Sequence, residues 1–370
     1  MTHTYHAAVA SDLEQRVADL AASVIATDEH SAAQAKERHD GLVKPQGSLG
    51  RLEQLGGQLA AIAQACPPPV PARATVAVCV GDHGVLAQGV SPWPQAITAA
   101  MVHAFCANKA AINILADTVG AEVTVLDVGV ASDLPPHPRL RSAKIRAGTC
   151  DLSREPALTR EEAARAILAG ADLASELRQC GADVVIGGDM GIGNTTAGAC
   201  LISAFTGLPA SQTTGRGTGI DDTTYTRKTA LVQAALDLHQ PDPSDPFGVL
   251  ACFGGLEHAA LCGLYLAAAS ERLPVILDGV AANAAALAAA AFSSHVRGYL
   301  IAGHRSTEPG ATAALSALNL EPLLDLELRL GEGTGALLAL PLVRAAAAVL
   351  ATMGTIAELT DSTADKPSLT

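Results

Sequence analysis

The sequence predicts an α/β protein with a mostly parallel sheet. Two observations support this fold class. Short apolar runs typical of β-strands alternate with alanine-rich stretches typical of helices. Each run is followed by glycine together with an acid or a histidine, which is the pattern expected where strands end at a ligand crevice. The five runs are Thr75–Val80, Glu122–Leu126, Asp183–Ile186, Pro274–Leu277 and Gly298–Ile301.

The N-terminal part of the chain is expected to be helical. Apolar residues recur at helical spacing from about residue 11 to residue 66, with one polar, glycine-containing interruption at Lys44–Gly50. Three consecutive prolines, Pro67 to Pro69, then mark a boundary. We therefore expect residues 1–68 to form a helical segment and the α/β core to begin at residue 69.

Composition argues against nucleic acid and membrane as partners. The chain has 24 Lys and Arg against 37 Asp and Glu, and only 3% of its residues are aromatic, so a nucleic-acid surface is not expected. The apolar tracts Val280–Phe292 and Ala336–Ala351 are short or interrupted by polar residues and Pro341, so we expect no membrane span. Eight isolated cysteines and a start unlike a signal peptide favour a cytoplasmic protein.

The ends of the five runs are expected to converge on one site, because ligands of open α/β sheets bind at the carboxyl ends of the strands. The alternative is that Asp and Gly simply favour turns after strands, which explains one or two such ends more easily than five. The polar residues at these ends are Asp82, His83, Asp127, Asp189, Asp278 and His304.

The stretch Val184–Thr196 has the pattern of a strand, a glycine turn and a helix start. Gly191 and Gly193 would let backbone N–H groups approach a ligand, and the helix N-terminus favours an anion such as phosphate. Asn194, Thr195 and Thr196 could cap the helix or donate to the anion. The stretch matches neither a P-loop nor a dinucleotide fingerprint, so a simple strand-to-helix connection remains the alternative.

Glu332 is the candidate general base. It lies between Gly331 and Gly333, after the apolar run Leu324–Leu330, so we expect it on a turn at the edge of the core. Partial burial would raise the pKa of its carboxyl towards neutrality. The alternative is a surface acid placed favourably at a helix start.

His83 and His304, with Asp82, Asp189 and Asp278, are a second candidate centre, for a metal or for hydrolysis. No pair among them has the i, i+3 or i, i+4 spacing of metal ligands on a helix, so we favour structural hydrogen bonding and expect no metal. Four apolar residues would wall a slot for an aromatic ligand if their loops meet, although each taken singly is more often part of a core. These four are Trp93, Met101, Met190 and Leu330.

Eight motifs follow one another along the chain: KPQGSLGRLE (44–53), GDHGV (81–85), GVSPWPQAIT (89–98), GGDMGIGNTT (187–196), GRGTG (215–219), LDG (277–279), AGHRSTEPG (302–310) and RLGEGTGA (329–336). Together they resemble the nicotinate-nucleotide:dimethylbenzimidazole phosphoribosyltransferase family. The resemblance implies a three-layer, Rossmann-like core over residues 69–339. It also implies a small helical domain in which residues 1–68 are joined by the C-terminal helices of residues 340–370.

The same resemblance implies transfer of phosphoribosyl from nicotinate mononucleotide to 5,6-dimethylbenzimidazole, by a homodimer that uses no cofactor. Glu332 would be the catalytic base, and Asp82 and Asp189 are candidates for supporting acids. The acceptor would contact Trp93, Met101, Met190 and Leu330. The donor would contact Gly191, Gly193, Asn194, Thr195, Thr196, Lys228, Asp278 and Ser306.

The sequence departs from the family pattern at three places. Asp189 stands where a glutamate is more usual, Trp93 stands where tyrosine or a smaller residue is common, and Ala107-Asn108-Lys109 replaces a more glycine-rich stretch. The acceptor therefore stays open between dimethylbenzimidazole, other benzimidazoles, purines and phenols. Two other functions also stay open: a metal-assisted hydrolase built from Asp82, His83, Asp278 and His304, and a non-catalytic nucleotide-binding protein in which Glu332 is inert.

Overall fold

The computed structural model describes residues 2–364, and six strands in this range form one parallel sheet. All neighbouring strands are parallel, in the order β3-β2-β1-β4-β5-β6. This is the Rossmann order, in which the direction of strand addition reverses between β1 and β4. The strands are β1 (Ala74–Gly81), β2 (Ala121–Gly129), β3 (Leu140–Ser142), β4 (Val184–Met190), β5 (Val275–Leu277) and β6 (Leu300–Ala302).

The predicted α/β class and the five predicted strands are confirmed. The structure adds β3, which pairs with β2 at one edge of the sheet. Its residues are exposed or half-buried, so no apolar run marked it in the sequence.

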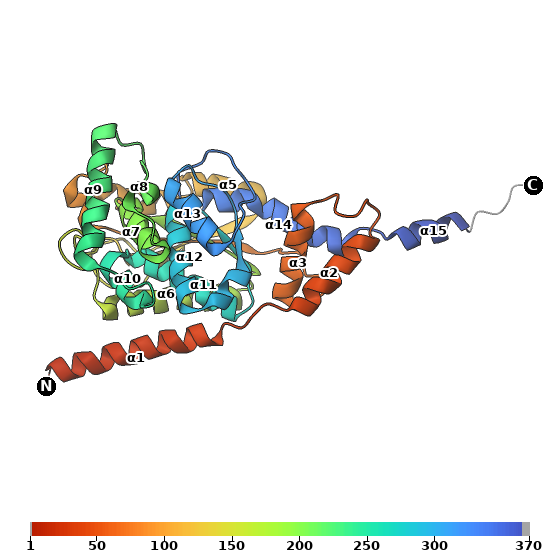
Figure 1. Ribbon diagram of the computed structural model, residues 1–370, viewed down its shortest axis with the longest axis horizontal. Helices are drawn as coiled ribbons and strands as arrows, with labels where there is room; N and C mark the ends of the chain where they lie inside the picture. The colour runs from red at the N-terminus through yellow and green to blue at the C-terminus, as the bar shows by residue number, and fades with distance from the viewer. Residues whose placement is uncertain (1, 365–370) are drawn as a thin grey trace, which may run out of the picture.

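Helices cover both faces of the sheet, giving three layers (Figure 1). In β1, Ala77 and Cys79 pack into one core whereas Val76 and Val78 pack into the other, because successive side chains of a strand point to opposite faces. One face carries α6 (Arg160–Gln179), α11 (Leu256–Ser270) and α12 (Val280–Phe292), and the other carries α4 (Ala96–Cys106), α5 (Ala111–Val119) and α14 (Thr334–Thr352).

The other helices extend this body (Figure 1). α1 (Thr2–Ser23) lies along α6 and α11, while α2 (Glu29–Gly41) and α3 (Arg51–Ala63) pack with α14 at the far end, beyond which α15 (Ile356–Ala364) projects. The division into a core and a small helical domain stays a prediction. The remaining elements are α7 (Asn194–Thr206), α8 (Ala210–Thr213), α9 (Asp222–His239), α10 (Pro246–Phe253), α13 (Pro309–Leu318) and the 3-10 helices η1 (Gly84–Gln88) and η2 (Ser294–Tyr299).

Arg344 fixes α14 to the start of the sheet. Its guanidinium donates hydrogen bonds to the carbonyl oxygens of Pro71 (2.9 Å) and Ala72 (3.0 Å), just before β1, and to that of Val119 at the end of α5. Charge-assisted bonds of this kind are stronger than neutral ones. The helix thus begins at the carboxyl ends of the strands and runs to their amino ends.

Two helical stretches, Ala96–Val119 and Thr334–Thr352, are long and apolar enough to cross a membrane by length and composition alone. The structure divides the first into α4 and α5. The second is α14, and 56% of its most apolar window is buried inside the protein. Because core helices pass the same test, these stretches are a weak indication of a membrane span.

Two glycines allow α6 and α11 to cross in direct backbone contact. A Cβ atom at Gly170 would lie 1.8 Å from the carbonyl oxygen of Ala260, and one at Gly263 would lie 1.7 Å from that of Ile167. Such distances are far below van der Waals contact, so a side chain at either position must push the helices apart.

Gly263→Ala is therefore expected to lower the free energy of unfolding by about 1–3 kcal/mol, the usual effect of overpacking a core. Urea unfolding of the purified protein measures it. Gly57→Ala in α3 is the matched control, because a Cβ there meets no atom within 4 Å and alanine favours helix by up to about 1 kcal/mol. Equal losses of stability in the two variants would contradict this account of the helix crossing.

Candidate active site

A cavity of about 440 Å³ lies at the carboxyl end of β4, between α4 and the loops that follow β5 and β6. It adjoins the point where the strand order reverses, which is where open α/β sheets bind ligands. The residues of the sequence-based prediction that line it are Trp93, Met101, Asp189, Met190, Gly191, Asn194, Thr195, His304, Ser306, Leu330 and Glu332.

Five residues predicted to bind the donor or to support the base lie outside the cavity lining, and their roles stay predictions. Gly193 and Thr196 belong to the turn that forms one wall. Lys228 reaches this wall through Thr195. Asp82 turns away towards the loop after β2, where it accepts a hydrogen bond from the N–H of Ala131 (2.8 Å). The fifth, Asp278, lies behind Glu332 and bonds to the backbone that follows it.

The wall next to β4 has the features of an anion site. α7 begins at Asn194, and its N-cap is Gly193, whose φ of +102° few other residues adopt. The helix N-terminus points partial positive charge at the cavity. No side chain caps this helix, so the predicted capping by Asn194, Thr195 or Thr196 is wrong, and their donation to an anion stays a prediction. Asn194 instead donates to the carboxyl oxygen Oδ2 of Asp189 (2.8 Å).

Lys228 supplies a positive charge next to this turn. It is only 1% exposed, and its Nζ donates to Thr195 Oγ1 (2.8 Å) and to the carbonyl oxygen of Gly215 (3.1 Å). Burial lowers the pKa of Lys228 to about 8, so its ammonium form is still favoured at neutral pH.

Glu308 and Arg329 hold the neighbouring loop, and the sequence-based prediction missed both. Glu308 Oε1 accepts from the N–H of Gly217 (2.8 Å), and Arg329 Nη1 donates to the carbonyl oxygen of the same residue (3.1 Å). Both side chains also line the cavity. The signal was present, since Glu308 lies two residues after Ser306 and Arg329 directly precedes Leu330 within recognised motifs.

Glu332 is buried where the loop before α14 packs against β4. Glu332 is 4% exposed, and its Oε2 accepts a hydrogen bond from the N–H of Ile112 (3.3 Å), so the alternative of a surface acid is excluded. Burial and the nearby charge of Asp278 together raise the pKa of Glu332 to about 7, against the opposing hydrogen bond from Ile112. A carboxyl with this pKa can take up and release a proton at neutral pH.

Asp189 places a second carboxyl in the same cavity. Burial, followed by the negative charges of Asp278, Glu257 and Glu332, raises the pKa of Asp189 to about 8. The N–H of Glu332 donates to the carbonyl oxygen of Asp189 (3.2 Å), so the two residues are adjacent. Near neutral pH the two side chains therefore carry fewer than two negative charges, as expected for coupled carboxyls in a buried site.

The mouth of the cavity is apolar. Trp93 is 49% exposed and Leu330 is 57% exposed, while Met101 and Met190 are half-buried beside them. Apolar walls with a few convergent polar groups are typical of sites for small aromatic ligands.

The two predicted histidines, His83 and His304, contact different acids. His83 Nε2 and His258 Nδ1 both lie 2.7 Å from Glu257 Oε1, and all three residues are buried. Their ligand atoms lie within 4.8 Å of one another, but 2.7 Å is shorter than the separation of two atoms that each hold a metal ion at about 2.1 Å, so a metal ion would need them to separate. His304 instead lies 3.3 Å from Asp278 Oδ1. The four residues of the hydrolase alternative thus divide between two places.

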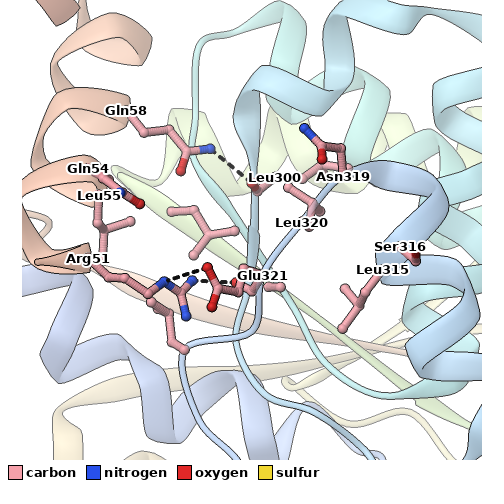
Figure 2. A pocket seen from close by; sticks show the side chains of 13 residues that line it. Arg51, Gln54, Leu55, Gln58, Leu300, Leu315, Ser316, Asn319, Leu320 and Glu321 are labelled. Carbon is pink, nitrogen blue, oxygen red and sulfur yellow. Dashed lines mark hydrogen bonds and ion pairs between the residues drawn. The ribbon is translucent and has the colours of Figure 1, made fainter.

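A second hollow of about 440 Å³ lies at the side edge of the sheet, between α3, β6 and the end of α13. Figure 2 shows Gln58 pointing at β6 and Arg51 paired with Glu321. Gln58 Nε2 donates to the carbonyl oxygens of Gly298 (3.0 Å) and Leu300 (2.9 Å). These contacts seal part of an exposed strand edge, which is a structural role.

Comparison with known proteins identifies the family. The family model described as "Phosphoribosyltransferase" matches residues 24–360. The nicotinate-nucleotide–dimethylbenzimidazole phosphoribosyltransferase of Salinispora tropica is 55% identical, over 87% of this chain and 93% of that protein. The chain belongs to the nicotinate-nucleotide–dimethylbenzimidazole phosphoribosyltransferase family. The protein of the same name from Chloroflexus aggregans is 50% identical, over 90% of this chain and 94% of that protein.

Solved structures of this family have the same fold. The crystal structure of CobT from Thermus thermophilus matches with a TM-score of 0.87 and 46% identity, over 90% of this chain and 98% of that chain. The predicted resemblance and the Rossmann-like α/β fold are therefore confirmed. The family match begins at residue 24, so α1 lies outside it.

Proposed function

We propose that this chain transfers the phosphoribosyl group of nicotinate mononucleotide to 5,6-dimethylbenzimidazole, giving α-ribazole 5′-phosphate and nicotinate. One observation carries the proposal: a single cavity brings the glycine turn at the start of α7 together with the buried carboxyl of Glu332. The names of the relatives support the same reaction.

In the proposed complex the donor phosphate lies at the N-terminus of α7, beside Lys228 and Thr195. The glycine turn supplies backbone N–H donors, and the ammonium group of Lys228 supplies a full positive charge. Ser306 lines the same part of the cavity and is available to the phosphoribosyl group. The aromatic acceptor lies between the apolar residues at the mouth, Trp93, Met101, Met190 and Leu330.

The chemistry needs one base. The pyridinium nitrogen of the donor is already positive, so nicotinate leaves with the electrons of the C1′–N bond and needs no general acid. One nitrogen of the benzimidazole attacks C1′ from the opposite face, which converts β to α stereochemistry. The other nitrogen loses its proton to Glu332. Positioning and the charged groups around the cavity supply the rest of the acceleration, so the reaction needs neither a metal nor a redox cofactor.

We further propose that the enzyme is a cytoplasmic homodimer acting on small molecules. All eight cysteines are free thiols, which agrees with a reducing compartment. Asp189 and Trp93 both line the cavity, so their departures from the family pattern bear on the choice of acceptor base.

Incubation of the purified protein with nicotinate mononucleotide and dimethylbenzimidazole, with and without a chelator, tests the reaction. Nicotinate and α-ribazole 5′-phosphate are expected in equal amounts in both cases. Binding of the donor without product would instead favour a non-catalytic nucleotide-binding protein, and loss of all turnover with chelator would favour the metal-assisted alternative.

The rate is expected to rise with pH through about 7. Glu332 accepts a proton only when it is ionised, and its pKa is raised to about 7, so the active fraction is small at pH 5.5 and nearly complete at pH 8.5. A profile of kcat/KM for the acceptor between pH 5 and 9 measures this limb. A limb near pH 4.5 would show that Glu332 is not the titrating base.

A further inference from the structure

The carboxylate of Asp278 accepts three hydrogen bonds from the backbone that follows Glu332. Its Oδ2 accepts from the N–H of Gly333 (3.1 Å), and its Oδ1 accepts from the N–H groups of Gly335 (2.8 Å) and Ala336 (3.0 Å). These are the N-cap residue and early residues of α14, whose N–H groups have no partner within the helix. Asp278 is 1% exposed and lies outside the cavity lining, so its oxygens face the protein and not the ligand space.

The turn that carries Glu332 needs such an anchor. Gly331, Glu332 and Gly333 have φ values of +86°, +65° and +90°, and a non-glycine residue in the left-handed region is strained. A Cβ on Gly188 would lie 2.4 Å from the carbonyl oxygen of Glu332, so β4 runs directly against this turn. Surrounding contacts must therefore hold the Glu332 backbone in place, and those from Asp278 are charge-assisted.

We propose that Asp278 is a positioning residue for Glu332 and does not bind the donor. This inference rests on the proposed function in one respect, namely that Glu332 is the base. Asp278 at the end of β5 fixes the start of α14 and so aims the Glu332 carboxyl at the cavity. The family resemblance implied contact between Asp278 and the donor, and the geometry assigns the residue a different task.

The negative charge of Asp278 also changes the pH at which Glu332 ionises, and a purely structural contact would not have this effect. Three titratable groups face the Glu332 turn: Asp278 after β5, Asp189 at the end of β4, and His304 after β6, which pairs with Asp278. α5 contributes only the N–H of Ile112. Because a nearby negative charge disfavours ionisation, removing the charge of Asp278 makes Glu332 ionise at lower pH.

Asp278→Asn tests the proposal. The amide oxygen can still accept from Gly335 and Ala336, but the amide nitrogen cannot accept from Gly333. We expect kcat to fall about 10- to 100-fold, as for misplacement of a catalytic group by about 1 Å. We also expect the acid limb of the pH profile to move down by about 1 unit. Affinity for nicotinate mononucleotide, measured by equilibrium dialysis, should stay within about threefold, because Asp278 does not contact the donor. A threefold change corresponds to about 0.6 kcal/mol of binding free energy.

Asp127→Asn is the matched control. Asp127 also follows a strand of this sheet and accepts from two backbone N–H groups, those of Gly129 (3.1 Å) and Val130 (2.9 Å), but it does not line the cavity. This variant should leave both kcat and the acid limb unchanged. In addition, Asp278→Asn should cause little further loss in an enzyme that already carries Glu332→Gln, because the two residues act as one unit.

Asp278→Glu covers the case in which the asparagine variant does not fold. It keeps the charge but moves the carboxylate, so kcat should fall while the acid limb and the donor affinity stay in place. Donor affinity reduced tenfold or more in either variant, or an acid limb unmoved in a folded Asp278→Asn protein, would overturn the proposal. If the wild-type protein releases no nicotinate, the proposed function fails, and the ¹³C carboxyl shift of Glu332 during titration still reports whether Asp278 controls its ionisation.

Discussion

Glu332→Gln is expected to lower kcat about 10²- to 10⁴-fold, the usual contribution of a general base, while affinity for nicotinate mononucleotide is unchanged. Glutamine has the same shape but cannot take the proton from the acceptor. The backbone of the turn is held by hydrogen bonds to the carboxylate of Asp278 and to the carbonyl oxygen of Asp189, which the substitution does not touch. Release of nicotinate in the steady state measures kcat, and equilibrium dialysis measures donor affinity.

The same variant has a stability signature with a definite sign. The pKa of Glu332 is raised from its ordinary value of 4.5 to about 7, so the folded protein holds this proton more tightly than the unfolded chain does. The contribution of Glu332 to wild-type stability therefore falls as pH rises from about 4.5 to about 7, and Glu332→Gln removes this contribution. The variant should gain stability relative to wild type between pH 5 and pH 8. An unchanged kcat would remove Glu332 from the mechanism, whatever the stability data show.

Lys228→Met is expected to weaken binding of nicotinate mononucleotide about 10- to 150-fold, which corresponds to the loss of one charged hydrogen bond. Methionine fills similar space in the buried site but carries no charge for the phosphate. Because burial lowers the pKa of Lys228 to about 8, wild-type affinity should also decline as pH rises through 8, and this decline should be absent from the variant. Calorimetry at pH 7 and pH 9 measures both effects.

Lys144→Met is the control for Lys228→Met. Lys144 pairs with Asp127 (3.6 Å) and is partly exposed, so it matches the change in charge and residue type at a place outside the cavity. Its donor affinity should equal that of the wild type. Equal affinities in all three proteins would show that Lys228 does not contact the phosphoribosyl group.

The sequence predicted five of the six strands because they leave local signals. It predicted less well which strand-end residues meet, since of the six polar residues at those ends only Asp189 and His304 line the cavity. Fully buried parallel strands have apolar runs in the sequence, and glycines mark the turn before α7. β3 left no such signal, because its three residues form a strand only through pairing with β2. The motifs also indicated Glu332 as the candidate base. Its burial could not be predicted from them, because it depends on α5 and β4, which lie far away along the chain.

Contacts between distant segments account for what the sequence could not predict. Lys228 meets Thr195 across 33 positions, and Asp278 meets Gly335 across 57. A resemblance can suggest that such residues share a site, but it does not say which atom each one binds. For Asp278 the difference decides between a contact with the donor and an anchor for the base.

Clamping α14 by Arg344 has a consequence for enzyme engineering. Arg344 lies ten residues after Thr334, or about 15 Å along the helix at 1.5 Å per residue, and α14, which contains Pro341 between these two residues, joins it to the turn that carries Glu332. Libraries that seek new acceptor bases by varying residues throughout the chain would also vary this arginine, and we expect such variants to be slower because the position of α14 changes. Randomisation is better directed to the mouth of the cavity, at Trp93 and Leu330, where the hydrogen bonds of Arg344 are left intact.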